Sequence, residues 1–165
     1  MQKKIELDNH IKNNPLLYKS FLLALEIIKL YKFLTTEKRE FILSKQLLKS
    51  GTSIGANSNE AVVGQSKRDF SAKLGIARKE GYETKYWLNL LIFSEYLSLN
   101  QTERAYSLLD ECMKIVCSSI NTSKIKPKSI KQKPETGKQK PKSRKQKAET
   151  GNQKAESRNR NAENI

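Results

Sequence analysis

The chain has 165 residues with 32 Lys and Arg against 17 Asp and Glu, a formal net charge of +15, and only 36% of its residues are hydrophobic. A typical globular chain is roughly 45–50% apolar, so part of this chain cannot contribute to a core. Residues 1–123 carry a net charge of +5 and residues 124–165 a net charge of +10. The sequence therefore predicts one ordinary domain followed by a basic tail.

Two protein classes are excluded by the most apolar stretch and by the N-terminus. Residues 16–34 contain four charged side chains: Lys19, Glu26, Lys29 and Lys32. A bilayer-spanning helix does not tolerate so many charges. The chain is polar through Asn14 and offers no apolar core of a signal peptide. Cys112 and Cys117 would lie about 140° apart on one helix, which prevents a disulfide between them. We expect a cytoplasmic protein with reduced thiols.

Residues 1–14 are predicted to be a flexible N-terminus, and the first helix begins where Asn14 caps it and Pro15 takes its first position. Apolar residues then recur at intervals of three and four: Leu17, Phe21, Ala24, Ile28, Tyr31 and Leu34. This spacing predicts one buried face of a helix. Thr36 and the charged residues 37–40 predict the start of a second helix that reaches about Val63.

The predicted buried stripe of the second helix consists of Leu43, Leu47, Ile54 and Ala61. Ser66, with Asp69 three positions later, has the form of a cap for a third helix, which we expect to reach about Leu97. Its stripe keeps a strict four-three spacing: Phe70, Leu74, Ala77, Gly81, Thr84, Leu88 and Leu91. Asn100 or Thr102 is expected to cap a fourth helix that ends near Ile120. That helix would bury Ala105, Leu108 or Leu109, Cys112, and Ile115 or Val116.

Four amphipathic helices joined by short loops predict an all-α protein, an antiparallel up-down-up-down four-helix bundle over residues 15–123. Residues 124–165 form six degenerate Lys-rich heptads that lack the two apolar positions of a coiled-coil seam. Pro127, Pro134 and Pro141 also interrupt any helix there. We expect this tail to be disordered. It is either an expansion without a dedicated role or a polybasic arm that contacts phosphates.

Small residues mark the expected contact between the second and third helices. They are Gly51, Gly55 and Ala56 on the second helix, and Ala77 and Gly81 on the third. Glycine inside a helix costs ~1 kcal/mol relative to alanine, so close approach of the two backbones is the expected compensation. A phosphate-binding loop is excluded because no Lys-Ser/Thr pair follows the second glycine.

Several motifs, in this order, resemble a known family. They are SKQLLKSGTSIGAN at residues 44–57, EA at 60–61, SKRDF at 66–70, ARKE at 77–80 and ETKYWL at 83–88. The chain is similar to the four-helix-bundle proteins encoded within intervening sequences of bacterial 23S rRNA genes. This group includes the accessory variability determinant of diversity-generating retroelements. The resemblance implies a homopentameric ring and, for the retroelement relative, a basic surface that binds nucleic acid and associates with a reverse transcriptase.

We expect no catalytic site, metal or cofactor. Carboxylate-bridged metal sites in bundles need histidines on the helices, and the only histidine, His10, lies outside the predicted bundle. Glu80 and Glu83 are instead expected to form ion pairs or hydrogen bonds. Their candidate partners are Lys45, Lys49, Arg78 and Lys85, within one chain or across a subunit boundary. Polar side chains on or beside the apolar faces, Ser50, Asn57 and Thr84, are expected to form a network that sets the register of the helices.

Tyr86 and Trp87 point about 100° apart on a helix, so both cannot enter one core. We expect one of them to contact a neighbouring subunit or solvent; the alternative is that both are partly buried in one bundle. The candidate nucleic-acid-binding residues lie on the second and third helices: Lys45, Lys49, Lys67, Arg68, Lys73, Arg78, Lys79 and Lys85. Two functions remain open, an accessory protein that holds RNA or DNA for a partner and a structural or interaction scaffold.

Overall fold

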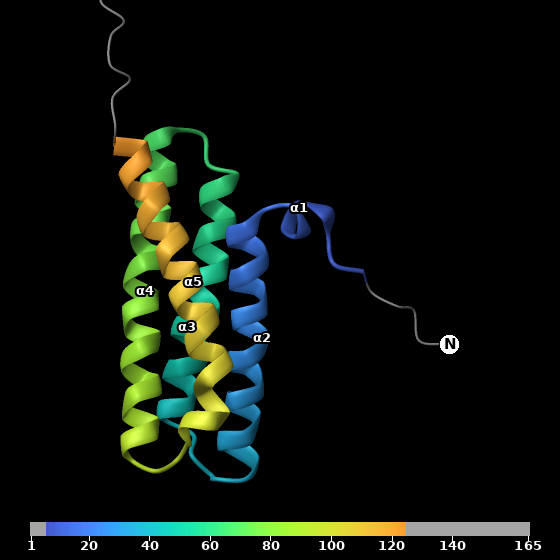
Figure 1. The fold of residues 1–165 in the computed structure, drawn as a ribbon, viewed down its shortest axis with the longest axis vertical. Helices are drawn as coiled ribbons and strands as arrows, with labels where there is room; N and C mark the ends of the chain where they lie inside the picture. The colour runs from blue at the N-terminus through green and yellow to red at the C-terminus, as the bar shows by residue number, and fades with distance from the viewer. Residues whose placement is uncertain (1–5, 125–165) are drawn as a thin grey trace, which may run out of the picture. The chain divides into compact units, whose positions relative to one another are not determined.

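Four long helices stand side by side and alternate in direction along the chain (Figure 1). The computed structural model describes residues 6–124, and none of these residues lies in a strand. The helices are α1 (Asn9–Lys12), α2 (Pro15–Thr36), α3 (Leu43–Val62), α4 (Lys67–Phe93) and α5 (Leu99–Lys124). Each long helix contacts the preceding one and α5 closes onto α2, so α2 and α4 occupy opposite corners. The predicted antiparallel four-helix bundle is confirmed.

The N-terminal stretch contains a short helix, and the predicted tail beyond Lys124 lies outside the described residues. The stretch expected to be a flexible N-terminus contains α1, a single turn whose first N–H groups include that of His10, which donates to the Asp8 carboxylate at 3.0 Å. The predicted disorder of the tail concerns residues beyond the end of α5, which lie outside the described residues. Within residues 6–124, no helix is both long and apolar enough to cross a membrane.

Two of the predicted helix starts are confirmed by their caps. The Asn14 side-chain oxygen accepts hydrogen bonds from two N–H groups of the first turn of α2, at 3.0 and 3.2 Å, and Pro15 takes the first helical position. The Ser66 hydroxyl accepts from the N–H of Asp69 at 3.1 Å at the start of α4. Each cap pairs N–H groups that have no partner within the helix.

The start of α5 differs from the prediction. The Ser98 hydroxyl accepts from the N–H of Gln101 at 3.3 Å, and the Gln101 side chain accepts from the N–H of Ser98 at 2.9 Å. This reciprocal pair is a capping box, so neither Asn100 nor Thr102 is the cap. The preceding helix, α4, ends at Phe93 and not at the expected Leu97. Residues 94–97 form the turn that leads into the capping box of α5.

The predicted start of the second long helix was wrong, because residues 37–42 form a loop. Glu40 folds back and its carboxylate accepts from the N–H groups of Ile42, Leu43 and Ser44 at 2.9, 2.8 and 2.6 Å. Burial of Glu40 opposes its ionisation, but these three donors outweigh that effect and hold the pKa of the carboxyl below its usual value. A side chain expected inside a helix is therefore the group that caps it.

The buried stripe of α2 is displaced from the predicted one. It consists of Leu16, Leu17, Ser20, Leu23, Ile27, Leu30 and Leu34. Of the predicted stripe only the first and last members are buried, whereas Phe21 is exposed and Ala24, Ile28 and Tyr31 are half-buried. Because α2 is apolar around most of its circumference, more than one stripe satisfies a spacing of three and four residues.

The stripes of the other helices follow the prediction more closely. On α3, Leu47, Ile54 and Ala61 are buried and Leu43 is half-buried. On α4 every predicted position is buried except the first, Phe70, which is half-buried. On α5 both leucines of the predicted alternative are buried, and Val116 is buried in place of Ile115. Two hydrophobic clusters of these residues form the core along the length of the bundle.

The glycines face different helices from the expected ones. A Cβ added to Gly51 would lie 2.8 Å from Ile27 Cγ1, and one added to Gly55 would lie 3.5 Å from the Ser20 hydroxyl oxygen; both neighbours belong to α2. A Cβ on Gly81 would overlap Met113 of α5. Gly51 and Gly55 therefore admit α2 against α3, and Gly81 admits a methionine of α5 against α4.

Replacing Gly51 by alanine is expected to lower the free energy of unfolding. The new methyl group would overlap Ile27, which is fully buried, and overpacking of ~1–3 kcal/mol outweighs the ~1 kcal/mol gained from helix propensity. Gly75→Ala is the matched control, because a Cβ there meets nothing within 4 Å, and it should stabilise by up to about 1 kcal/mol. Urea unfolding measures both, and a Gly51→Ala protein as stable as Gly75→Ala would refute this packing.

Replacing Glu40 by glutamine is expected to destabilise the protein by ~1–2 kcal/mol at neutral pH, because a neutral amide loses the charge-assisted hydrogen bonds to the start of α3. The folded pKa of Glu40 lies below its usual value. Its stabilisation is therefore complete above the usual carboxyl pKa and is lost as the pH falls through the folded pKa. The difference in stability between the two proteins should shrink on acidification; a pH-independent difference in thermal melts would contradict this role.

Candidate nucleic-acid and assembly surfaces

The eight candidate cations do not gather on one surface. Lys45 and Lys49 lie on α3, and the other six lie on α4. Of the α4 cations, Lys73 bonds Glu60 of α3 at 2.5 Å, a hydrogen bond that raises the pKa of the lysine, and Lys85 lies 4.0 Å from Asp110 of α5. The remaining six have no carboxylate within 4 Å among residues 6–124: Lys45, Lys49, Lys67, Arg68, Arg78 and Lys79.

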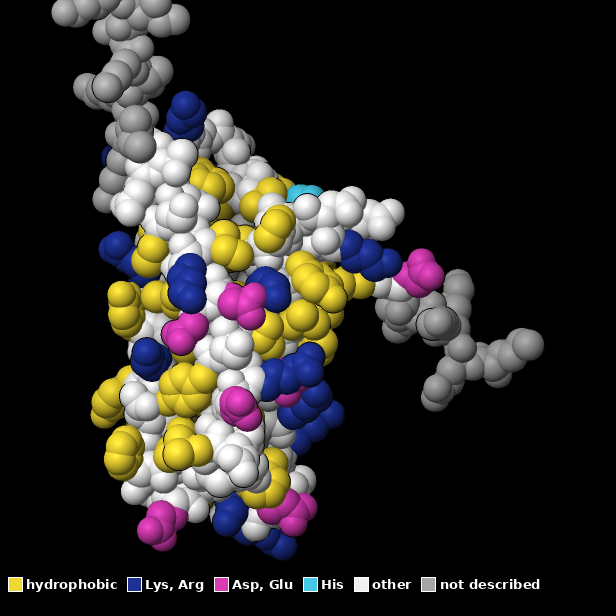
Figure 2. Space-filling model, viewed as in Figure 1, with side chains coloured by type: hydrophobic (Ala, Val, Ile, Leu, Met, Phe, Trp, Pro, Cys, Tyr) yellow, Lys and Arg dark blue, Asp and Glu magenta, His cyan; other side chains and the backbone are white. Residues whose placement is uncertain are grey.

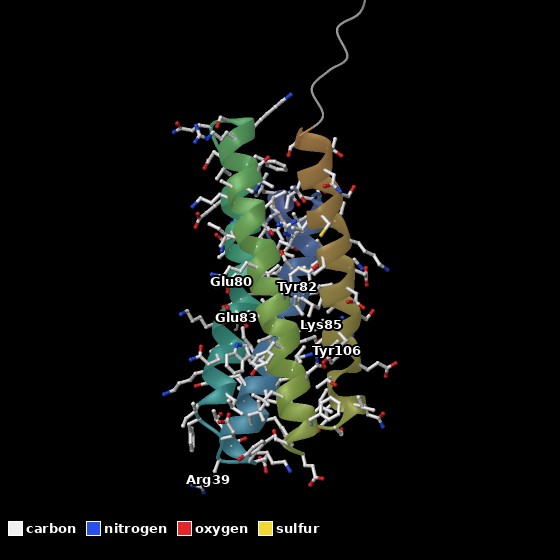
Figure 3. All side chains as sticks on the ribbon, turned by 90° about the vertical axis from the view of Figure 1, so that its left-hand side faces the viewer. Arg39, Glu80, Tyr82, Glu83, Lys85 and Tyr106 are labelled. Carbon is white, nitrogen blue, oxygen red and sulfur yellow. The ribbon has the colours of Figure 1, made fainter. Side chains whose placement is uncertain are left out.

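The two flanks of α4 carry opposite charge. Glu80 and Glu83 project on the side of α3, whereas Tyr82 and Lys85 project on the side of α5 (Figure 3). Lys85 shares its flank with Arg78, seven residues earlier, because seven residues nearly complete two helical turns. We refer to these as the acidic flank and the basic flank of α4. A single basic patch spanning α3 and α4 is therefore interrupted by carboxylates.

The expected ion pairs of the two carboxylates do not form within residues 6–124. No Lys or Arg nitrogen lies within 4 Å of Glu80 or Glu83 there. The Glu83 carboxylate accepts a hydrogen bond from Trp87 Nε1 at 3.3 Å. Both glutamates are only half-buried, so their charges are solvated in one chain and remain open to a cation from outside it.

Tyr86 and Trp87 divide as expected between solvent and the bundle. Trp87 is half-buried against the larger core cluster, whereas Tyr86 is 58% exposed. Their rings pack edge to face with centroids 5.0 Å apart, an arrangement that favours a fixed orientation of both. Of the two, Tyr86 is the residue that is free to contact another molecule.

The polar side chains on the apolar faces form no network between helices. The Ser50 hydroxyl donates to the carbonyl of Leu47, the Asn57 amide to Ser53 and the Thr84 hydroxyl to Glu80. Each bond returns to the preceding turn of the same helix, which satisfies the polar group locally. These residues therefore do not set the register between helices, and the prediction of such a network was wrong.

Exposed apolar side chains mark two faces of the bundle, and of these side chains the sequence analysis singled out only Tyr86 for contact outside the bundle. The α2 face consists of Tyr18, Phe21 and Leu25, and the α4 face of Ile76 and Tyr86 together with Glu83. Figure 2 shows hydrophobic side chains along both edges of the bundle, over α4 on the left and α2 on the right. The sequence did contain a signal for the α2 face, because α2 has more apolar residues than one buried stripe requires.

A groove adjoins the α2 face. It has a volume of about 220 Å³ and lies between α2 and α3, with Phe21 and Ala24 on one wall and Gly55 and Ala56 on the other. Ile11 of α1 also lines it. The α3 wall of the groove is shallow because glycine and alanine have small side chains. The groove can therefore accept a large side chain from another molecule.

The described residues were compared with the expectations for metal binding and for the two thiols. Residues 6–124 contain no group of three His, Cys, Asp or Glu side chains placed to hold a metal ion, and His10 lies on α1 outside the bundle. Cys112 and Cys117 are free thiols. Burial of Cys112, with a smaller effect of Glu111, raises its pKa to about 12, so the thiol stays protonated and is a poor nucleophile.

Both a family model and solved structures match the bundle. The family model described as 23S rRNA-intervening sequence protein matches residues 12–118. The crystal structure of a protein of unknown function from the S23 ribosomal protein family of Bacteroides thetaiotaomicron is 50% identical, with a TM-score of 0.62. That match covers 64% of this chain and 97% of the other. No curated protein matches the chain.

Proposed function

The chain belongs to the family of 23S rRNA-intervening sequence proteins, and we propose that it is a non-enzymatic nucleic-acid-binding accessory protein that works as a ring of identical copies. In this proposal it acts in the cytoplasm and holds RNA or DNA for a partner protein such as a reverse transcriptase. The resemblance to the accessory variability determinant of diversity-generating retroelements supports the partner and a pentameric ring. The observation that carries the proposal is the set of six candidate cations without a carboxylate partner.

Charge gives the bundle its attraction for polyanions. Residues 1–123, which we call the body, have a net charge of +5. Five bodies in a ring sum to about +25 before the tails are counted, a charge sufficient to concentrate nucleic acid around the assembly. Phosphate contacts of this kind carry no sequence information. We therefore expect weak sequence preference, with the body setting where a strand lies and the Lys-rich tail adding affinity that salt removes.

The arrangement of apolar faces supports a ring. A cyclic ring joins each copy to the next through two different surfaces on opposite sides of the molecule, and the α2 face and the α4 face lie on opposite corners of the bundle. In this arrangement the exposed Tyr86 ring of one copy enters the groove beside the α2 face of the next copy. Lys32 on α2 is exposed and can pair with Glu80 and Glu83 of the next copy.

A partner protein has a separate surface available at the end of the bundle that holds the α2–α3 and α4–α5 loops (Figure 1). Ile42, Phe93 and Leu99 are 72 to 87% exposed there. Apolar side chains this exposed are typical of protein interaction sites. This end of the bundle is opposite to the one at which α5 ends (Figure 1).

Nucleic-acid binding is tested by titrating the purified protein into labelled single-stranded RNA at several salt concentrations. Each neutralised phosphate contributes about −0.7 to the slope of log affinity against log salt, and we expect a slope of about −3 or steeper. Arg78→Glu combined with Lys79→Glu should weaken binding and flatten the slope. Lys12→Glu combined with Lys38→Glu, on α1 and in a loop, is the control with the same charge change.

Two outcomes decide between the functions. Absence of binding to RNA and DNA at ~50 mM salt would remove the nucleic-acid function. If a ring still forms in that case, the alternative of a structural or interaction scaffold accounts for the protein. A high ratio of absorbance at 260 nm to that at 280 nm before a high-salt wash, and a low ratio after it, would support binding to cellular nucleic acid.

Assembly is tested with two variants that each block one face, Leu25→Asp on the α2 face and Tyr86→Asp on the α4 face. Both side chains are exposed in one chain, so the bundle itself should fold. Because a ring interface joins unlike faces, each variant alone should be monomeric in light scattering. An equimolar mixture retains one intact interface and should form heterodimers.

The wild-type protein should be a pentamer in the same measurement. Wild-type protein that is monomeric at high micromolar concentration would refute the ring. If instead the Leu25→Asp variant alone forms dimers, the interface joins two α4 faces, and the head-to-tail arrangement is wrong although self-association is not.

A further inference from the structure

Two hollows follow one another along the seam between α4 and α5. The lower hollow, of about 410 Å³, lies where Gly81 leaves α4 low beside Met113 of α5, and Tyr82, Lys85 and Lys114 line it. The upper hollow, of about 390 Å³, lies between the start of α4 and the end of α5. The seam is therefore indented at two places, and a path from one to the other runs along α4 and α5.

Cations follow this path. Lys67 lines the upper hollow, Lys85 and Lys114 line the lower hollow, and Arg78 lies between them on the basic flank of α4. Helical rise places Lys67 and Lys85 about 27 Å apart. Among residues 6–124, Lys67, Arg78 and Lys114 have no carboxylate within 4 Å. Their charges are therefore available to a polyanion that runs along the seam.

One carboxylate, Asp110, lines the described hollows. It lies 4.0 Å from Lys85 and near Tyr106, whose pKa is raised by burial and by the charge of Asp110. The Tyr106 hydroxyl donates to the Asn89 side chain at 2.5 Å. The negative charge of Asp110 is thus confined to one point of the seam, where Lys85 offsets it.

The seam also offers groups that suit an unpaired strand. Tyr82 is 63% exposed at the rim of the lower hollow, and an exposed aromatic ring is a platform on which a base stacks. The upper hollow is lined by hydroxyl groups that include those of Ser118 and Ser119, which can donate to phosphate oxygens. Stacking requires a base that is not paired, which favours single-stranded over duplex nucleic acid.

We propose that one single strand of RNA or DNA lies along the α4–α5 seam, with phosphates on Lys67, Arg78, Lys85 and Lys114 and a base stacked on Tyr82. This inference rests on the proposed function and replaces a binding surface shared by α3 and α4. On that other side Glu80 and Glu83 repel phosphates.

The test uses the full chain and a fluorescein-labelled oligouridine. The seam variant combines Lys67→Gln, Arg78→Gln and Lys114→Gln. The control variant removes the same charge from exposed positions elsewhere, Lys12→Gln, Lys38→Gln and Arg39→Gln. At ~50 mM salt the seam variant should lose about tenfold or more in affinity and its salt slope should flatten by about 2, as for three lost phosphate contacts, whereas the control should lose less than about threefold.

A third variant tests the competing surface, with Lys45→Gln and Lys49→Gln on α3. Equal losses in the seam and control variants, or a larger loss in the α3 variant, would overturn the seam while leaving nucleic-acid binding intact. Failure of the wild-type protein to bind would instead refute the proposed function. Light scattering and circular dichroism check that all variants keep the assembly and helicity of the wild type.

Photocrosslinking gives a second readout that does not depend on net charge. An oligonucleotide that carries 4-thiouridine should crosslink to the peptide that contains Tyr82, and Tyr82→Ala should abolish that adduct. Tyr86→Ala, four residues later on the outer side of the same helix, should leave it in place. Crosslinks confined to α3 or to the tail peptides would overturn the assignment of the strand to the seam.

Discussion

The buried stripe of α4 fixes the rotation of that helix, and the surfaces of the molecule follow from it. Leu74, Ala77, Thr84 and Leu88 point into the core and are fully buried. A helix that buries one stripe has two flanks and an outer face left over. Rotation of α4 by one residue would bring Glu83 towards the core and move Tyr82 and Lys85 off their flank. The cost of burying a charge excludes that alternative.

The same fixed rotation lets one helix serve two purposes. Its acidic flank and outer face carry Glu83 and Tyr86, which suit contact with another copy of the chain. Its basic flank carries Arg78 and Lys85, which suit phosphates. Because the two sets of side chains diverge from a common axis (Figure 3), a neighbouring copy can contact one without covering the other. The carboxylates would also keep a strand from sliding into the contact between copies.

The sequence was sufficient to predict those elements whose residue pattern is compatible with only one arrangement. The Asn14-Pro15 and Ser66 caps and the α4 stripe were predicted because their residue types and spacing admit one register. The α2 stripe was not, because that helix is apolar nearly all round and the choice of face depends on its neighbours. Glu40 was assigned to a helix because its charge and position suit one, although its carboxylate instead accepts from the N–H groups of residues 42–44 and caps α3 from the preceding loop.

The candidate surface shows a similar division. Counting basic residues by helix grouped the cations of α4 with Lys45 and Lys49, since periodicity gives a residue's face and not the identity of the helix beside that face. The partner helices of Gly51 and Gly81 were misjudged for the same reason. Lys114 and Tyr82 drew no attention because neither belongs to a motif; their relevance comes from the hollow that Gly81 opens between them.

Salt should act differently on the two surfaces, and this follows from their chemistry. In the proposed ring, the α2 and α4 faces would meet mainly through apolar side chains, whose burial is not weakened by salt, with carboxylates as a secondary contribution. In the proposed complex, the seam would hold a strand through phosphates, and each such contact releases counterions and weakens as salt rises. An assembly built this way keeps its ring while its cargo dissociates. Strand release then requires no rearrangement of the bundle, because the groups that hold the strand are separate from those that hold the copies together.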